Sequence, residues 1–386
     1  MPGQQQQEQP MPSSSPPISA QNSGPGRRKF SRRNVLFGGL ATLGGAYIAG
    51  SGLWWATRPR SLYIYRGYTV FTPGLQQTAD GVNALAWSAD GKRIASGRSN
   101  EVRVWDAANG TLAYTHWAKP VEYMRAGSVK SVIWSPNGKY LASSTTNERV
   151  QVWNAANGAD IHTYRPDSWG LNEHVVPITW APDSQFIASG YWDYLDGLTP
   201  SVRVWNALTG QSPLMYSGHT QALSAVAWSP DGKLIASGSE DHTIQVWDPI
   251  SGDLFFKTDV DSSTIDVLWS ADSKRIAYFH GSGPGLRIQD IATGKIVQSL
   301  QADRFHTIDT LVKPVWSLDG KYIAVAARTS MFDLPVVYVW DATTGAHIYS
   351  YSGHQTRLNA IAWSPDSKRI ASSDLDRLVH VWEINA

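Results

Sequence analysis

The sequence contains no cysteine, and this absence excludes several kinds of chemistry. Disulfide bonds, thiolate metal sites, cysteine nucleophiles and a lipid-modified N-terminal cysteine are all ruled out. It does not fix the redox compartment, because exported proteins can also lack cysteine. The chain has neither an HExxH pattern nor a nucleophile-elbow pattern, and its ten histidines show no ligand spacing. We therefore expect no resident metal and no cofactor.

The chain also has little net charge, +1 at neutral pH, but its charges are unevenly distributed. Seven of the 33 Lys and Arg residues and one of the 32 acids lie in residues 1–60, so the remainder carries 26 bases against 31 acids. Nucleic-acid binding depends mainly on basic contacts to phosphates. The mildly acidic body therefore argues against nucleic acid as the main partner.

The N-terminal region divides into two parts. Residues 1–33 are rich in Gln, Pro, Ser and Gly, end in a basic cluster, and are predicted to form a disordered tail. Residues 34–57 contain no charge, and a helix of this length spans about 36 Å, against about 30 Å for the hydrocarbon core of a bilayer. We expect a transmembrane helix or signal anchor over 34–57. The alternative is a buried globular helix, but the segment has no amphipathic stripe.

The segment that enters this helix, Ser31-Arg32-Arg33, resembles the bacterial twin-arginine export signal. The alternative is that the arginines only obey the positive-inside rule. Both interpretations keep the N-terminus cytoplasmic and place the body outside, since more basic residues precede the helix than follow it. Ala49-Gly50-Ser51 offers small residues for signal cleavage, whereas Trp54 and Trp55 suit a membrane interface and favour retention as an anchor. We expect a single-pass cell-membrane protein with an extracytoplasmic body.

Tryptophan is abundant, with 18 residues against nine Phe, and it recurs at fixed places. One marker is the Trp of AWS, VWS and related runs, at intervals of 41 to 48 residues: Trp87, Trp134, Trp180, Trp228, Trp269, Trp316 and Trp363. A second marker follows it in six units, and Gln289 replaces it in the fifth: Trp105, Trp153, Trp205, Trp247, Trp340 and Trp382. Such spacing is close to one four-stranded propeller blade. Residues 61–386 are therefore predicted to form seven blades.

The clearest unit runs from Gly218 to Asp248 and contains three runs that alternate apolar with small or polar residues, separated by polar turns. Through Gly218-His219 and Trp247-Asp248 it resembles the WD-repeat family. The resemblance implies an all-β, seven-bladed β-propeller of four-stranded antiparallel blades. It also implies two buried hydrogen-bonded chains, one formed by His219, Ser237, Asp241 and Trp247 and the other by His354, Ser372, Asp376 and Trp382.

The two ends of the repeat array predict how the ring closes. The last unit stops after its third strand, and YIYRGYT (Tyr63 to Thr69) matches YSYSGHQ (Tyr349 to Gln355), which joins units six and seven. The strand at Leu62 to Tyr65 is therefore expected to complete the last blade, which removes an open sheet edge.

The Ser-His-Asp sets suggest hydrolysis as an alternative function. The matching family positions lie buried between strands, so no substrate would reach the hydroxyl. One acidic turn recurs in six blades, but a single carboxylate per turn does not build a calcium site. A cofactor-binding or hydrolytic propeller enzyme remains the rival class.

Long inserts fall on one face of the predicted disc, between strands two and three and between consecutive blades. They carry aromatic and Met residues of the types that anchor interfaces: Trp117, Tyr123, Met124, Trp169, Tyr191, Trp192, Tyr194, Met331 and Phe332. We expect this face to bind a protein or peptide. The alternative is that these side chains fold back to form the cores of their own loops.

Together these patterns predict a membrane-tethered, non-catalytic protein-binding scaffold. A second possibility is an extracytoplasmic sensor that signals through a membrane partner, since residues 1–33 contain no output domain.

Overall fold

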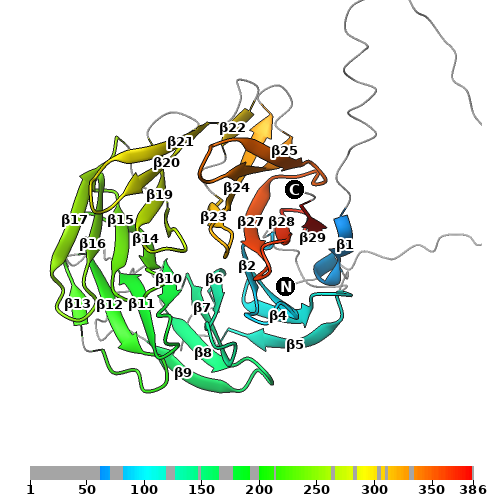
Figure 1. Cartoon of the computed structure of the whole chain (residues 1–386). Helices are drawn as coiled ribbons and strands as arrows, with labels where there is room; N and C mark the ends of the chain where they lie inside the picture. The colour runs from blue at the N-terminus through cyan, green and yellow to red at the C-terminus, as the bar shows by residue number, and fades with distance from the viewer. Residues whose placement is uncertain are drawn as a thin grey trace, which may run out of the picture. The chain divides into compact units, whose positions relative to one another are not determined.

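The computed structural model describes residues 61–69, 81–118, 127–146, 149–164, 177–191, 200–212, 214–261, 266–280, 285–301, 306–308, 312–329 and 334–384. These residues form β-strands and one short 3-10 helix, arranged as seven antiparallel sheets around a central channel (Figure 1). The prediction of an all-β, seven-bladed propeller is confirmed. The predicted tail over 1–33, the helix over 34–57 and the export signal at Ser31, Arg32 and Arg33 lie outside the described residues.

We number the sheets as blades in chain order. Blades 1 to 3 contain β2 (Ala84–Trp87), β3 (Arg93–Arg98), β4 (Glu101–Asp106), β5 (Leu112–Trp117), β6 (Val129–Trp134), β7 (Tyr140–Thr145), β8 (Val150–Asn154), β9 (Asp160–Tyr164), β10 (Ile178–Trp180), β11 (Phe186–Tyr191), β12 (Ser201–Asn206) and β13 (Leu214–Tyr216). Blades 4 and 5 contain β14 (Leu223–Trp228), β15 (Ile235–Ser239), β16 (Thr243–Trp247), β17 (Leu254–Asp259), β18 (Val267–Trp269), β19 (Arg275–His280), β20 (Gly285–Asp290) and β21 (Ile296–Gln301).

Blades 6 and 7 depart from this simple order. Blade 6 contains β22 (His306–Ile308), β23 (Val315–Trp316), β24 (Tyr322–Thr329), β25 (Pro335–Asp341) and β26 (His347–Tyr351), and both β22 and β23 pair with β24. Its innermost position is thus filled by two short strands. Blade 7 contains β27 (Leu358–Trp363), β28 (Arg369–Asp374), β29 (Val379–Glu383) and, from the other end of the chain, β1 (Ser61–Tyr65), which the 3-10 helix η1 (Gly67–Thr69) follows.

Ring closure depends on the pairing of β1 with β29. The two strands are antiparallel, with Tyr63 opposite Val381 and Tyr65 opposite Val379, and they lie side by side in Figure 1. The strand begins at Ser61, one residue before the segment expected from the sequence. The first and last parts of the propeller therefore share one sheet, which leaves no unpaired edge between them.

The cores of this structure lie between blades. Seven clusters of buried hydrophobic residues each join side chains from two adjacent blades, including one that joins blade 7 to blade 1. Burial falls from the middle of a blade outwards: β15 and β16 are fully buried, whereas β17 is mostly exposed. A single blade thus cannot bury its own apolar faces, and its stability depends on its neighbours.

A stacked ring pair crosses five of the seven junctions between blades. In each pair an aromatic side chain of one blade's outermost strand lies parallel to the second-marker Trp of the next blade, with ring centroids 4.0 to 4.6 Å apart. The pairs are His116 with Trp153, Tyr164 with Trp205, Tyr216 with Trp247, Tyr351 with Trp382, and Tyr65 with Trp105.

The junction between blades 4 and 5 explains why Gln289 replaces this Trp. Its outer strand offers Thr258 in place of an aromatic ring, and Gln289 Nε2 donates to Thr258 Oγ1 at 3.4 Å. Gln289 Oε1 also accepts from the Tyr278 hydroxyl at 2.9 Å. A polar pair therefore takes the place of the stacked rings.

The first-marker tryptophans connect the innermost strands. Four indole N–H groups donate to a carbonyl of the preceding blade at 3.0 to 3.2 Å: Trp87 to Ala362, Trp134 to Ala86, Trp269 to Ala227 and Trp363 to Val315. The recurrence of this Trp in the sequence thus has a structural cause, because it ties neighbouring blades together around the channel.

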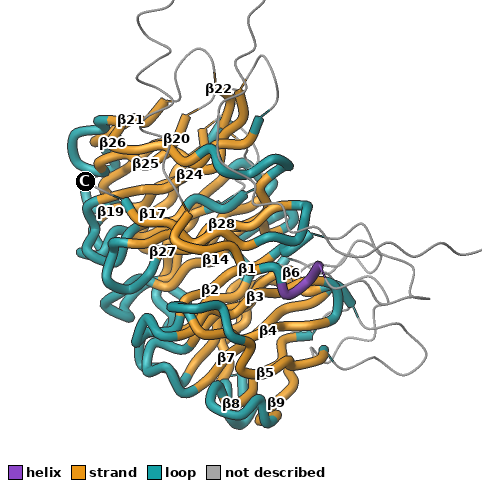
Figure 2. Tube along the Cα trace, turned by 90° about the vertical axis from the view of Figure 1, so that its right-hand side faces the viewer, coloured by secondary structure: helices purple, strands orange, loops and turns teal. Residues whose placement is uncertain are grey.

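The strands run across the thickness of the ring between loops at its two faces, as the side view shows (Figure 2). We call the side with the turns between strands one and two and between strands three and four the first face, and the opposite side the second face. Ser61 lies opposite Trp382, near the end of β29, so β1 begins at the first face. Among the described residues, no helix is long and apolar enough to cross a membrane.

Candidate functional site

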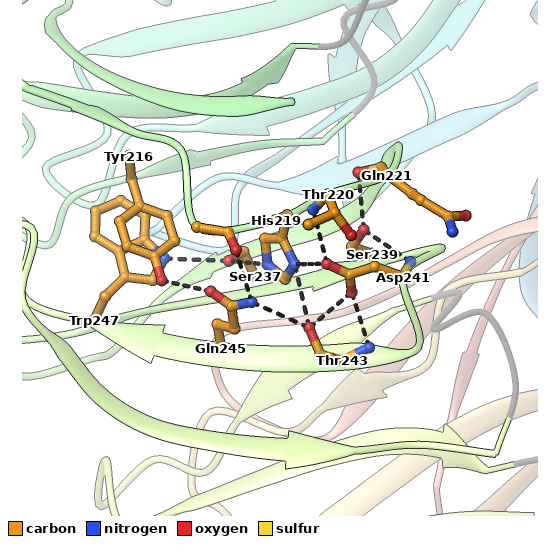
Figure 3. Close-up of polar contacts among 11 residues, drawn as sticks. Tyr216, His219, Thr220, Gln221, Ser237, Ser239, Asp241, Thr243, Gln245 and Trp247 are labelled. Carbon is orange, nitrogen blue, oxygen red and sulfur yellow. Dashed lines mark hydrogen bonds and ion pairs between the residues drawn. The ribbon is translucent and has the colours of Figure 1, made fainter. Parts of the chain in front are cut away.

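The buried polar network of blade 4 contains the four residues expected from the sequence (Figure 3). Trp247 Nε1 donates to Ser237 Oγ at 3.1 Å, and Ser237 Oγ lies 2.9 Å from His219 Nε2. His219 Nδ1 lies 2.9 Å from Asp241 Oδ2. A neutral His219 with its proton on Nδ1 satisfies every one of these contacts, so all the donors point in one direction, from Trp247 to Asp241.

The electrostatics of this network fit that assignment. Burial lowers the pKa of His219 more than its contact with Asp241 raises it. Burial opposes ionisation of Asp241, but hydrogen bonds from Thr243, from the Thr220 backbone and from His219 keep the pKa of this carboxyl below its ordinary value. Near neutral pH the pair is therefore a neutral imidazole beside a carboxylate.

Three further side chains extend the network beyond the expected four. The Tyr216 hydroxyl donates to Gln245 Oε1, and Gln245 Nε2 donates to Thr243 Oγ1 at 3.2 Å. Thr243 Oγ1 in turn donates to Asp241 Oδ1 at 2.7 Å. The sequence held a signal for Tyr216, because a Tyr also stands two residues before the glycine in Tyr65-Arg66-Gly67 and Tyr351-Ser352-Gly353.

The prediction that Asp376 is the buried acid of blade 7 is wrong. His354 Nδ1 lies 2.6 Å from Asp374 Oδ2, not beside Asp376. The other contacts are as expected: His354 Nε2 lies 2.7 Å from Ser372 Oγ, which accepts from Trp382 Nε1 at 3.0 Å.

The change of acid has a local cause. Alignment of the two turns puts Asp376 at the place of Asp241, but Leu378 stands where Thr243 holds that carboxylate with its hydroxyl. The Leu378 N–H donates instead to Asp374 Oδ1 at 3.0 Å. Asp374, at the position of Ser239, therefore supplies the buried carboxylate, and it is 1% exposed.

Blade 7 also contains a second histidine that the sequence analysis did not single out. The rings of His354 and His380 are stacked, with centroids 3.9 Å apart, and His380 Nδ1 lies 2.8 Å from the Tyr351 hydroxyl. His380 occupies the place of Gln245 in blade 4. Burial, followed by the neighbouring His354, lowers the pKa of His380 to about 3, and Arg66 acts in the same direction against Asp374.

His354, Asp374 and His380 are the described group that could hold a metal, since their ligand atoms lie within 4.8 Å of one another. Their geometry favours a hydrogen-bonded core. The two rings lie within 19° of parallel, so their in-plane lone pairs do not converge on one point, and both nitrogens of His354 already have partners.

Blades 1 and 3 replace the histidine by a tyrosine. Trp105 Nε1 donates to Ser96 Oγ at 3.0 Å, and the Tyr68 hydroxyl lies 3.0 Å from the same oxygen. The guanidinium of Arg103 lies over the Tyr68 ring, 4.4 Å from its centroid. A cation over an aromatic face is attracted to the ring, so the Tyr and Arg pair can replace the His and Gln pair of blade 4.

Tyr191, predicted to contact a partner, belongs to the same kind of network in blade 3. It is 4% exposed, its hydroxyl accepts from Ser189 Oγ at 2.9 Å, and Ser189 Oγ accepts from Trp205 Nε1 at 2.8 Å. Arg203 lies over its ring at 5.5 Å. The predicted contact role of Tyr191 is therefore wrong, because the side chain ends β11 pointing into the core.

Trp117 lies at the end of β5, at the second face, and is 58% exposed. It is the described member of the predicted contact set that is available to solvent. The remaining members lie outside the described residues: Tyr123, Met124, Trp169, Trp192, Tyr194, Met331 and Phe332. The hydroxyls of Ser237 and Ser372 are fully buried and each lies between a Trp and a His, so neither is placed to attack a substrate.

Comparison with known families agrees with this fold. The family model described as WD domain, G-beta repeat, matches residues 70–106, 210–248 and 345–383. A model of the anaphase-promoting complex subunit 4 WD40 domain matches residues 114–183. The chain is a seven-bladed β-propeller with buried Trp–Ser contacts in four blades, and the WD-domain model matches three of its segments.

Several curated proteins are similar to this chain. It is 23% identical over 314 residues to "Cell division cycle 20.1, cofactor of APC complex" of Arabidopsis thaliana, a match covering 78% of this chain and 63% of that protein. It is 24% identical over 319 residues to "WD repeat-containing protein 26 homolog" of Arabidopsis thaliana, covering 81% and 50%. The chain thus spans about half to two thirds of the length of these two relatives.

Among solved structures, a chain of "Crystal Structure of Mitotic Checkpoint Complex" superposes with a TM-score of 0.66 at 20% identity. The match covers 85% of this chain and 96% of that chain. At this identity the likeness shows the fold.

The two candidate acids of blade 7 give a matched test. Asp374→Ala should lower the free energy of unfolding by about 1–3 kcal/mol, because it leaves the buried His354 without its acceptor. Asp376→Ala should change it by less than about 0.5 kcal/mol. Urea denaturation of both variants at neutral pH measures the difference. Equal losses would contradict the assignment of Asp374.

The buried histidines predict that the protein loses stability in acid. His380 binds a proton in the unfolded chain near its ordinary pKa but in the folded chain only near 3, so stability is fully present above about pH 6.5 and falls as the pH drops towards 3. His380→Gln, which copies blade 4, should reduce the loss between pH 7 and pH 5 by up to about 2 kcal/mol. Denaturation of both proteins at the two pH values tests this, and an unchanged loss would count against it.

Proposed function

We propose that this propeller is a non-catalytic scaffold that binds a protein or peptide through its second face. The observation that carries the proposal is Trp117, a large aromatic side chain that is 58% exposed at the edge of that face. Leu334 and Leu375 are also exposed there, at 48% and 43%. Trp is among the residue types enriched at protein interfaces and at their binding hot spots.

Two further points support binding over catalysis. The described Ser-His-Asp sets are buried structural networks. The names of similar proteins describe a cofactor of a complex and a chain in a checkpoint complex. By analogy, this chain would act by holding a partner.

We further propose that residues 34–57 tether the propeller to a membrane, with the propeller outside the cytoplasm. The support is the charge-free run itself and the basic cluster that precedes it. Since β1 begins at the first face, a tether that ends before Ser61 would join the propeller on that side. The second face would then remain open to a partner.

Binding can be tested by site-specific photo-crosslinking in intact cells. A photoreactive amino acid in place of Trp117 should give a discrete adduct with a partner protein, whereas the same group in place of Ile250, 88% exposed on the first face, should not. Mass spectrometry of the adduct identifies the partner. Adducts from Ile250 alone would move the binding site to the first face.

The tether can be tested by extraction and protease access. The full chain should stay in the membrane pellet after alkaline carbonate, and protease added to spheroplasts should cleave the propeller. Replacing Arg32 and Arg33 by Lys should block export if the signal is read by the twin-arginine route and leave it unchanged if the residues act by charge alone. A chain released by carbonate, or one protected from protease, would overturn the tether or its orientation.

A further inference from the structure

On the first face, a hydrogen bond between the turns of neighbouring blades is present at some junctions and absent at others. The turn between strands one and two of each blade has a residue with positive φ, which is Ser in blades 3, 5 and 7 and Gly in blades 1, 2, 4 and 6. Each Ser hydroxyl accepts a backbone N–H from the preceding blade at 3.0 or 3.1 Å: Ser184 from Asn137, Ser273 from Asp231 and Ser367 from Asp319. We call this contact the serine latch.

The junction between blades 1 and 2 has no such latch, because Gly138 stands at the position of the serine. A Cβ at Gly138 would meet only the Cβ of Ala89, at 3.9 Å. Two small residues therefore face each other across this junction. Beside them lies a cleft of about 800 Å³.

The cleft is lined by more basic than acidic side chains. Lys92 and Arg93 come from blade 1 and Lys139 from blade 2, against one acid, Asp90. Asp90 Oδ1 is held by the Ser88 hydroxyl and the Lys92 N–H, and these contacts lower the pKa of its carboxyl. Lys92 and Lys139 are exposed, so two ammonium groups from opposite walls can approach one anion.

A second cavity, of about 600 Å³, adjoins this cleft at the mouth of the channel and shares Ser88, Ala89 and Trp134 with it. No charged side chain lines it, and its walls include Trp87, Trp134, Trp269, Trp316 and Trp363. The indole N–H groups of these five residues already donate to backbone carbonyls. They therefore offer apolar ring atoms but no hydrogen-bond donor to a ligand, and Trp87, Trp269 and Trp363 are each 7–8% exposed.

We propose that these two adjoining cavities form a binding site for an organic anion with an apolar or aromatic body. The apolar body would lie against the tryptophans at the channel mouth, and the anionic group would lie between Lys92 and Lys139. Both volumes fall within the range of small-molecule sites, and the pairing of an apolar surface with a few charged groups is typical of them. The site lies on the first face, away from the partner surface at Trp117.

The chain supplies its own variant to test this proposal. Gly138→Ser should reproduce the serine latch by accepting the Asp90 N–H, because Gly138 and the three latch serines share a positive φ. The latch would draw the turns together across the cleft. The matched control is Gly232→Ser, since an added Cβ there also has room, 3.9 Å from Pro182, but lies at the junction between blades 3 and 4.

Anilinonaphthalene sulfonate is a suitable probe, because it joins an anion to an aromatic body and accepts energy from tryptophan. The folded full-length protein in detergent-free buffer should bind it saturably, and Gly138→Ser should weaken binding roughly tenfold while Gly232→Ser leaves it unchanged. Equal binding by all three proteins, or an equal loss in both variants, would overturn the site. Circular dichroism confirms that each variant is folded.

The role of the lysines is tested by charge. Replacing Lys92 and Lys139 by Gln should weaken binding of the sulfonate probe roughly fivefold and leave binding of neutral phenylnaphthylamine unchanged. Loss of both probes would mean that the substitutions disturb the cavity. Unchanged binding of both probes would contradict the proposed role of the two lysines in holding an anion.

Discussion

The stacked contact between an outer-strand ring and the Trp of the next blade is the interaction on which the rest of this structure depends. All six second-marker tryptophans are fully or almost fully buried, yet five of them stack on a ring from the blade before. No blade can therefore complete its own core, which is the general condition of repeat proteins. If the ring stayed open, Trp105 would have no stacking partner; in the closed ring Tyr65 of β1 stacks on it.

The strand β1 thus has two structural roles. Its backbone pairs with β29, and its side chains contact blade 1, where Tyr65 stacks on Trp105 and the Tyr63 hydroxyl donates to the Ala107 carbonyl at 2.7 Å. Closing so long a loop costs chain entropy, and this cost is met by contacts on both sides of the strand. The histidine pair of blade 7 lies next to this closing contact, since His380 of β29 is opposite Ile64 of β1.

The buried polar chains show which parts of a repeat can change. The pairing of Trp with Ser is the same in blades 1, 3, 4 and 7, where the indole always donates to the hydroxyl. The next member can be His or Tyr, because either provides a polar atom within reach of the serine. In each of these four blades the indole and the serine hydroxyl have partners, and an unpaired buried polar group is costly in a medium of low dielectric constant.

The sequence was sufficient for the number of blades, for the closing strand and for the order of the hydrogen bonds in blade 4. These features repeat, and each unit supports the interpretation of the others. The errors fall where one blade departs from the pattern. Asp376 aligns with Asp241, but the deciding residue is Leu378, whose lack of a hydroxyl shifts the contact to Asp374. Tyr191 looked like a loop aromatic because the tyrosine that replaces His in blade 3 ends strand β11, whereas His219 lies in the loop before β14.

The serine latches could not be predicted either, since Ser and Gly are both ordinary turn residues. Their arrangement follows from the number of blades. Latches at alternate junctions cannot close on themselves around an odd ring, so two consecutive junctions must lack one, and both of these flank blade 1. On one side β1 supplies contacts of its own through Tyr63 and Tyr65. On the other side Arg93 reaches across to the Ala155 carbonyl at 3.0 Å, and the turns above it remain apart. The junctions between blades 3 and 4 and between blades 5 and 6 also lack a latch, and the cleft lies where the small residues Gly138 and Ala89 face each other.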